Sequence, residues 1–535
     1  MIKQFIIAGL FITASVSAQK KAPADWQLLD PAADGVYGAG VEQAYKTLKG
    51  KKAKTVIVAV IDSGTDIDHE DLKDVIWTNP GEIPNNGIDD DKNGYVDDVH
   101  GWSFLGGKNG DINNESSELA RMYFRLDKKF KDADTSSFSN DNAKEFAVYK
   151  NIKYTFLKEQ FENEMELQSI QVFADYLENV KKDNNGKLSK SGLKNYKPKT
   201  KLETSIKKQL KFIMLIGMKP EEMDEEIAAG RKEIENKVKN SRINSDSIRR
   251  YVVGDDPENM TEHYYGCNRV QGPEALHGTH VSGIIAAMRN NNLGINGIAD
   301  NVKIMPIRAV PNGDERDKDV ANAIRYAVDN GASIINMSFG KYYSPNKKEV
   351  DEAVQYALSK DVLLVHAAGN ESKNSDLDLS FPNSELLSGG TVNNWIDAGA
   401  SSYNKGKNLI GSFSNYGKTK VDLFAPGVDI YSTIPGNKYI SESGTSMASP
   451  STAGVAALIR SYFPELKAGE VKAVLMKTAE KYNKKVYVPG AYKRRFIRLF
   501  GSKKVKKNVS ELCVSGGFIN ANNAVKELMG LNKKK

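Results

Sequence analysis

Runs of apolar residues alternate with amphipathic stretches over two parts of the chain. The first run, residues 55–61 (TVIVAVI), is almost unbroken and rich in β-branched side chains, which is typical of a parallel strand buried on both faces. Similar runs predict strands at 302–305, 333–337, 362–365, 389–392 and 421–424. Helical spacing predicts helices at 279–289, 317–329, 347–359, from 446 onward and at 468–479. This alternation predicts an α/β fold, with a parallel sheet covered by helices on both faces and a site at the carboxyl ends of its strands.

A different pattern fills the chain from Ser103 to about Glu262. This stretch is densely charged, with little proline or glycine, and its apolar residues recur at helical spacing. We expect helices at 143–180, 200–217 and 220–241, with a turn at 184–186. The pattern therefore predicts a large helical insertion, residues 108–262, that divides the α/β domain into residues 51–107 and 263–480.

The amino terminus has the features of a cleavable secretory signal over residues 1–18. One lysine precedes a short apolar run, and small residues stand at Val16 and Ala18. This run is too short to span a bilayer, and no later apolar stretch is long enough. We expect a protein without a membrane span that is exported to the periplasm or the medium, with an extension over residues 19–50.

Composition narrows the remaining possibilities. An apolar fraction of 40% in 535 residues is ample for a large core. The net charge of +7 comes mostly from a basic C-terminal segment, residues 481–535, and no aromatic pattern accompanies it, so we expect a solvated surface rather than a nucleic-acid site. Cys267 and Cys513 could form one disulfide or stay free, and two cysteines with six histidines make a zinc site improbable.

Four polar residues stand where the predicted strands end or the predicted helices begin. Asp62 follows the first strand, His277 opens HGTHVSG, Asn370 closes AAGN, and Ser446 lies in GTSMASP at the start of a helix. Each alone has an ordinary role, as a helix cap, a turn residue or a structural histidine. Together they supply a nucleophile, a base, a carboxylate and an oxyanion donor, which are the groups that acyl transfer needs.

The segments VIVAVIDSGTDIDHEDL, HGTHVSGIIAA, INMSFG, AAGN and GTSMASP resemble the subtilisin-like serine proteases, the subtilase or peptidase S8 family. They occur in the family's order of Asp, His, Asn and Ser. The resemblance covers about residues 50–100 and 265–480. It implies a three-layer subtilisin-like fold and an endopeptidase that acts on protein or peptide substrates.

The resemblance also implies a role for each site residue. Ser446 would attack the scissile carbonyl, His277 would take its proton, and Asp62 would orient the imidazole. Asn370 and the backbone N–H of Ser446 would bind the oxyanion. The substrate would pair with a cleft segment formed by Ser338, Phe339 and Gly340.

Several points stay open at this stage. His280 is a rival imidazole on the same helix, and Ser451 stands where the family commonly has a histidine. An exopeptidase is a weaker alternative, and an inactive scaffold that binds a partner through the helical insertion is a non-enzymatic one. The extension over residues 19–50 is short for the folded pro-domain of many family members. The insertion could overhang the cleft and filter substrates, or it could be a peripheral docking module.

A second motif, DDDKNGYVDD at residues 89–98, has the spacing of a calcium-binding loop. Oxygen ligands are expected from Asp89, Asp91, Asn93, the carbonyl of Tyr95, and Asp97. Position 12 of the loop is a histidine rather than glutamate, so a full EF-hand is excluded, and Asp98 or a distant carboxylate could complete the shell. The alternative is an acidic turn that binds nothing. The family resemblance adds that calcium (Ca²⁺) would be structural, with no cofactor for the chemistry.

Overall fold

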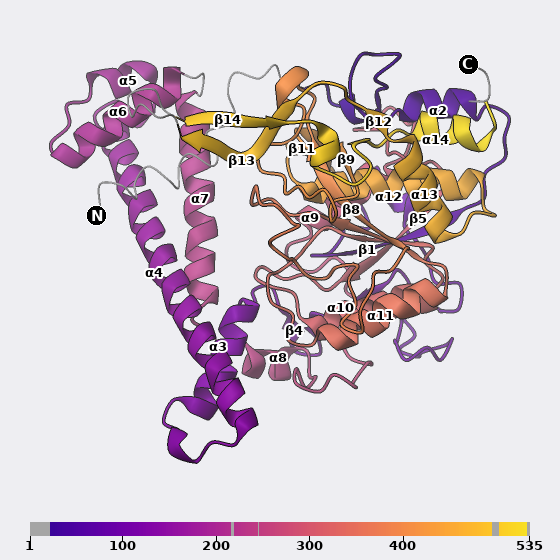
Figure 1. Cartoon of the computed structure of the whole chain (residues 1–535), viewed down its shortest axis with the longest axis horizontal. Coiled ribbons are helices and arrows are strands. Elements are labelled where there is room, and N and C mark those ends of the chain that lie inside the picture. Colours follow the sequence, from indigo (N-terminus) through magenta and orange to yellow (C-terminus); the bar gives the residue numbers. More distant parts are fainter. Residues whose placement is uncertain (1–21, 216–218, 244, 495–501, 532–535) are drawn as a thin grey trace. The chain divides into compact units, whose positions relative to one another are not determined.

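The computed structural model describes residues 22–215, 219–243, 245–494 and 502–531. The predicted signal sequence, residues 1–18, lies outside the described residues. The chain divides into two compact units (Figure 1). We call Glu115–Ser245 the helical unit, and Ala22–Asn114 together with the chain from Asp246 onward the α/β unit.

The α/β unit is built on a nine-stranded sheet with the strand order β12-β15-β9-β8-β7-β6-β1-β5-β2. Its strands are β1 (Val56–Asp62), β2 (Trp102–Ser103), β5 (Val302–Arg308), β6 (Ile334–Met337), β7 (Leu363–Ala367), β8 (Trp395–Ser401), β9 (Leu423–Pro426), β12 (Glu480–Lys481) and β15 (Gly517–Phe518). Every neighbouring pair is parallel except β12 and β15. Successive side chains of a strand point to opposite faces, so a parallel sheet of this size needs two covering layers.

Helices supply both layers. The helices of the α/β unit are α2 (Val41–Thr47), α8 (Asp246–Val252), α9 (Leu276–Ala286), α10 (Asp317–Asp329), α11 (Lys347–Ser359), α12 (Thr445–Tyr462), α13 (Ala468–Thr478) and α14 (Ala521–Leu528). Val58 and Val60 of β1 pack in one core with α2, α9, α12, α13 and α14. Ala59 and Ile61 pack in the other core with α10 and α11. The predicted three-layer α/β fold with helices on both faces is therefore confirmed.

One predicted strand is misplaced. The run at 389–392 is a turn, because Gly389 and Gly390 adopt positive φ angles of 92° and 83°, and the strand β8 begins only at Trp395. By contrast, α10 and α11 have the predicted bounds of 317–329 and 347–359.

The C-terminal segment contributes to the sheet. Phe518 of β15 pairs with Phe424 of β9, and β13 (Val486–Arg494) pairs antiparallel with β14 (Ser502–Lys507) in a separate two-stranded sheet. A β-hairpin of β10 (Ile430–Ile434) and β11 (Lys438–Glu442) leads to α12, and a small hairpin joins β3 (Gly106–Gly107) to β4 (Gly110–Asp111). The α/β unit thus continues past residue 480 into the segment that the sequence marks as basic. No helix in the described part of the chain has the length and apolar character needed to cross a lipid bilayer.

The helical unit contains α3 (Glu118–Phe130), α4 (Asn140–Lys182), α5 (Lys190–Asn195), α6 (Lys201–Leu215) and α7 (Pro220–Asn240). The long helices α4 and α7 run side by side (Figure 1). Three of the helices begin at a serine whose hydroxyl accepts a backbone N–H of the first turn: Ser117, Ser139 and Ser189. The unit is shorter at both ends than the expected insertion of residues 108–262.

The two ends of the helical unit meet. The hydroxyls of Ser116 and Ser245 are 2.8 Å apart and hydrogen-bonded. In the α/β unit, Asn114 forms a bridge with Asn312, and Arg316 donates to Asp246 at 2.7 Å. The chain therefore leaves and re-enters the α/β unit beside the same loop, between β5 and α10.

A buried ionic network holds the returning chain on α10. Arg249 of α8 is fully buried and donates to both carboxylate oxygens of Asp319, at 2.6 and 2.8 Å, and to Asp255 Oδ2 at 3.1 Å. Lys318 contacts Asp255 at 2.8 Å, and Tyr265 donates to Asp319 at 2.7 Å. Because buried charges need partners, this network fixes the segment that leads to His277.

Candidate active site

The carboxylate of Asp62 and the imidazole of His277 form the first pair of the site. Asp62 is the last residue of β1, and His277 is the second residue of α9. The distance from His277 Nδ1 to Asp62 Oδ1 is 2.7 Å, and the N–H of Ser63 donates to the same oxygen at 2.7 Å. Gly278 permits this approach, because a Cβ there would lie 2.1 Å from the carbonyl oxygen of Gly64.

The surroundings of His277 favour its role as a base. Burial alone would lower its pKa, but the charge and hydrogen bond of Asp62, with a smaller effect of Glu442, raise the pKa above its ordinary value. When neutral, the ring donates through Nδ1 to Asp62, so its Nε2 is left as the proton acceptor.

The rival imidazole of His280 is held differently. Burial first, and then the charge of His277, lower the pKa of His280 to about 4, so its ring is neutral at pH 7. Its Nε2 lies 3.3 Å from the carbonyl oxygen of Ile440, to which it donates. We conclude that His280 joins α9 to β11 and is a structural residue.

Ser446 is the second residue of α12, and its neighbour orients Asn370. The backbone N–H and the hydroxyl of Thr445 donate to Asn370 Oδ1 at 2.8 and 2.9 Å. The amide nitrogen of Asn370 is thereby left for another acceptor. A Cβ built on Gly444 would lie 3.5 Å from the backbone nitrogen of Ser446 and 3.6 Å from Asn370 Nδ2, so both donors border one small volume.

The hydroxyl of Ser446 points to the cleft segment. It donates to the carbonyl oxygen of Ser338 at 3.2 Å, and among the described residues it has no hydrogen bond to His277. Ser338 in turn donates to the carbonyl oxygen of Ser446 at 3.0 Å. Catalytic hydrogen bonds often form only when substrate is bound, so this geometry is compatible with a nucleophile.

The remaining cleft residues continue β6 beyond its end. Phe339 is half-buried and packs on the core beneath α10 and α11, while Gly340 is exposed. Lys341 forms an antiparallel bridge with Phe381, at 2.9 and 2.8 Å. Ser451 has a packing role, because it is buried and donates to the carbonyl oxygens of Pro426 and Met447.

The acidic loop places its carboxylates differently from the calcium ligands expected from the spacing. Both oxygens of Asp89 accept backbone N–H groups of the loop, from Asn93 and Gly94, and those of Asp97 accept N–H groups of residues 86 and 87. The side-chain oxygen of Asn93 accepts the N–H of Tyr95. Of the expected side-chain ligands, Asp91 is the one that joins a cluster able to hold a metal ion.

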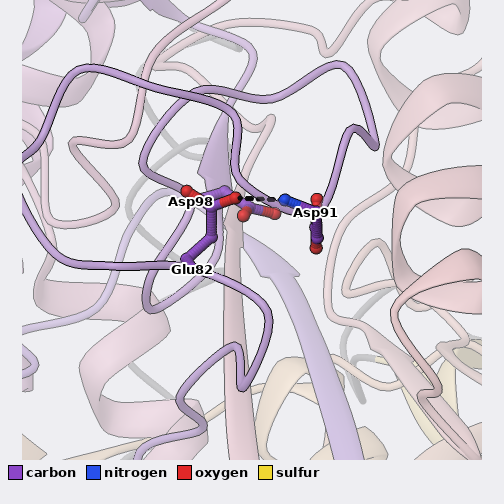
Figure 2. A group of neighbouring side chains, drawn as sticks. All are labelled: Glu82, Asp91 and Asp98. Carbon is purple, nitrogen blue, oxygen red and sulfur yellow. Dashed lines mark hydrogen bonds between the residues drawn. The ribbon is translucent and has the colours of Figure 1, made fainter.

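That cluster consists of Glu82, Asp91 and Asp98, whose ligand oxygens lie within 4.8 Å of one another (Figure 2). Glu82 is 8% exposed, and its Oε2 is buried without a hydrogen-bond partner among the described residues. Burial raises the pKa of both Glu82 and Asp98. A buried oxygen without a donor beside two further carboxylates fits a hard cation such as Ca²⁺.

Both cysteines are free: Cys513 is buried and Cys267 is half-buried. Of the two possibilities that the sequence left open, the structure has the free thiols.

A sheet edge that carries a serine at a helix start, a histidine–aspartate pair and an asparagine amide defines the class of serine hydrolases with an α/β core. The family model described as "Subtilase family" (peptidase S8) matches residues 53–510. The chain therefore belongs to the subtilase family.

Individual relatives are proteases by name. The thermophilic serine proteinase of Bacillus sp. strain AK1 is 44% identical over 187 residues, which are 35% of this chain and 42% of the relative. Thermitase of Thermoactinomyces vulgaris is 39% identical over 206 residues (38% and 67%), and subtilisin DY of Bacillus licheniformis is 38% identical over 205 residues (38% and 70%). The matched region thus spans less than half of the first relative. A solved structure of proteases from Pseudoalteromonas arctica aligns with 94% of this chain and 99% of its own, with a TM-score of 0.48 and 17% identity.

Proposed function

We propose that this subtilase is an exported serine endopeptidase that hydrolyses peptide bonds through an acyl-enzyme on Ser446. The observation that carries the proposal is the 2.7 Å bond between His277 and Asp62 at the sheet edge where Asn370 is tied to the residue before Ser446. The names of the relatives support the same activity.

In the proposed mechanism, Ser446 Oγ attacks the scissile carbonyl while His277 Nε2 takes its proton. Asp62 stabilises the imidazolium that forms. The developing oxyanion accepts hydrogen bonds from the backbone N–H of Ser446 and from Asn370 Nδ2. His277 then gives its proton to the leaving amine, and a water molecule activated by the same histidine hydrolyses the acyl-enzyme.

Labelling with a fluorophosphonate tests this mechanism. The wild-type protein should be labelled on one serine, and Ser446→Ala should not be labelled at all. Digestion of a denatured protein should yield internal fragments, measured by mass spectrometry. Release of single residues or dipeptides would indicate an exopeptidase, and a wild type that is neither labelled nor active would support the inactive scaffold.

We further propose that Glu82, Asp91 and Asp98 hold a structural Ca²⁺. When bound, the ion would balance three carboxylates on one loop, which otherwise repel one another. At a free Ca²⁺ concentration of about 100 times Kd, binding would stabilise the folded state by about 2.7 kcal/mol. We therefore expect Tm to fall on chelation with EGTA and to recover with Ca²⁺.

Two variants separate the cluster from the spacing-based ligand set. Glu82→Gln should abolish the response of Tm to Ca²⁺. Asp89→Asn should keep that response, because Asp89 bonds to the loop backbone instead. Equal responses of both variants to Ca²⁺ would contradict the cluster as the site.

Export is proposed from residues 1–18 and is tested separately. Expression in a secreting host, followed by mass spectrometry of the amino terminus, should find a mature chain that begins near Gln19. Fractionation would then assign the protein to the periplasm or the medium, and an intact Met1 in the cytoplasm would contradict export.

A further inference from the structure

A second histidine–aspartate pair lies inside the α/β unit, away from the nucleophile. His366 of β7 is buried, with 2% of its side chain exposed. Its Nδ1 lies 2.7 Å from Asp397 Oδ1, and its Nε2 lies 2.8 Å from the carbonyl oxygen of Phe339. Because a backbone carbonyl can only accept, Nε2 donates to Phe339, and Nδ1 shares the second hydrogen bond of the ring with the carboxyl group of Asp397.

The pair is held rigidly from the next strands. Asp397 of β8 accepts the indole N–H of Trp395 through its other oxygen, at 2.9 Å. The backbone N–H of Asp397 donates to Asp422 at 2.9 Å, and Asp422 is in turn 2.9 Å from the ammonium of Lys472. The imidazole of His366 is thus held by Asp397 at Nδ1 and donates to the carbonyl oxygen of Phe339 at Nε2.

Phe339 lies between the two residues that face the site. The carbonyl of Ser338 accepts the hydroxyl of Ser446, and consecutive carbonyls of an extended segment point to opposite sides. The carbonyl of Phe339 therefore points inward, to His366, and the polar groups of Gly340 share the outward side with those of Ser338. A Cβ on Gly340 would lie 3.5 Å from His366 Nε2, so the backbone rests directly on the ring.

We propose that His366, held by Asp397, is a positioning residue for the substrate main chain. By fixing the carbonyl of Phe339, it sets the direction in which Ser338 and Gly340 offer backbone hydrogen bonds to an extended peptide. The inference rests on the proposed peptidase function, because it concerns how that activity recognises its substrate.

The position of the contact predicts which substrates depend on it. A tetrapeptide anilide extends along the cleft segment and uses its backbone groups, whereas an acetylated single-residue ester ends before it can reach Gly340. Loss of one hydrogen bond to the peptide, about 1.4 kcal/mol, corresponds to about a tenfold loss of kcat/KM. The ester should not show this loss.

Two variants of the same residue isolate the critical bond. In His366→Gln the side-chain amide takes the place of Nε2 and can still donate to Phe339, whereas in His366→Asn it takes the place of Nδ1 and reaches only Asp397. We expect the ratio of peptide to ester kcat/KM to fall about tenfold in H366N, mainly through KM, and to be largely rescued in H366Q. Active sites are counted by fluorophosphonate labelling, so partial unfolding cancels from both rates.

A third variant tests the proposal if neither the H366N nor the H366Q protein folds. In Asp397→Asn, a neutral His366 can still donate through Nε2 to Phe339 while its Nδ1 accepts from the new amide, so the peptide-to-ester ratio should stay near that of the wild type. Equal ratios in H366N and H366Q, or a fallen ratio in D397N, would overturn the positioning role. Failure of the proposed peptidase function can be told apart from failure of the positioning role. In that case the wild type itself would not be labelled and would not hydrolyse the ester.

Discussion

The direction of one amide, that of Asn370, depends on Thr445, the residue before the proposed nucleophile. Thr445 donates twice to its oxygen, so the amide nitrogen is turned to the volume beside the backbone nitrogen of Ser446. A carboxamide that could rotate freely would lose entropy at each encounter with the oxyanion. The two hydrogen bonds fix its direction before the substrate arrives.

Gly444→Ala tests this arrangement without strain. The φ angle of Gly444 is 174°, which any residue adopts, but the new methyl group would lie 3.5–3.6 Å from both donors. We expect kcat to fall by about 10²-fold, comparable to the loss of one oxyanion donor, with Tm nearly unchanged. Gly230→Ala on α7 is the matched control, because a Cβ there would touch only the side chain of Ile170, at 3.9 Å, and should leave kcat unchanged.

In the proposed mechanism, the pH profile depends on Glu442, a carboxylate outside the three proposed catalytic residues. Only neutral His277 can accept a proton, so activity rises as the pH passes its pKa. Asp62 and, less strongly, Glu442 raise that pKa. Glu442→Gln removes one negative charge, lowers the pKa of His277, and should move the acid limb of kcat/KM to lower pH. Glu166→Gln in the helical unit should leave the limb in place, and an unmoved limb in E442Q would contradict the coupling.

The proposed catalytic residues could be predicted from the sequence because a short segment of small residues surrounds each one. The proposed roles of Glu442 and His366 could not be predicted, because their partners His277, Asp397 and Phe339 are distant in the chain. Glu82 lies close to Asp91 and Asp98 in the sequence but outside the spaced motif, so spacing alone does not find it either. The calcium loop shows the limit of spacing, since the backbone N–H groups of the loop use the oxygens of Asp89 and Asp97. Side-chain direction, which spacing does not encode, determines that the carboxylates of Glu82, Asp91 and Asp98 gather in one cluster.

At the scale of elements, strong periodicity predicted the helices well and irregular turns did not. The bounds of α10 and α11 follow from apolar faces that pack on the sheet. The apparent strand at 389–392 failed because two glycines with positive φ make a turn there. Strands as short as β12 and β15 leave no periodic pattern, so the sheet's extension into the C-terminal segment could not be predicted.

The attachment of α8 to α10 depends on one fully buried cation. Arg249→Leu would leave the carboxylates of Asp255 and Asp319 buried with less compensation, and we expect the free energy of unfolding to fall by about 3–5 kcal/mol. The adjacent substitution Arg250→Leu removes an exposed ion pair with Asp256 and should change the free energy of unfolding little. Urea denaturation measures the free energy of unfolding of both variants. Equal losses in the two would contradict the claim that the buried ion pairs of Arg249 stabilise the fold more than an exposed pair does.

At the scale of the whole molecule, the two units have separate cores and closely spaced junctions. Replacing residues 117–244 by a short glycine–serine linker closes a gap that the Ser116–Ser245 hydrogen bond already spans. We expect the shortened protein to fold and to be labelled at Ser446 at the wild-type rate. Loss of labelling together with a collapsed Tm would show that the α/β unit needs the helical unit to fold.

Because the chain leaves and re-enters the α/β unit beside one loop, that position can accept an inserted domain of different sequence. Recombination could exchange the 115–245 cassette for another, or remove it, without shifting any strand of the sheet. Related enzymes can then diversify by exchanging the domain inserted at this one site, while the residues of the active site evolve independently of it.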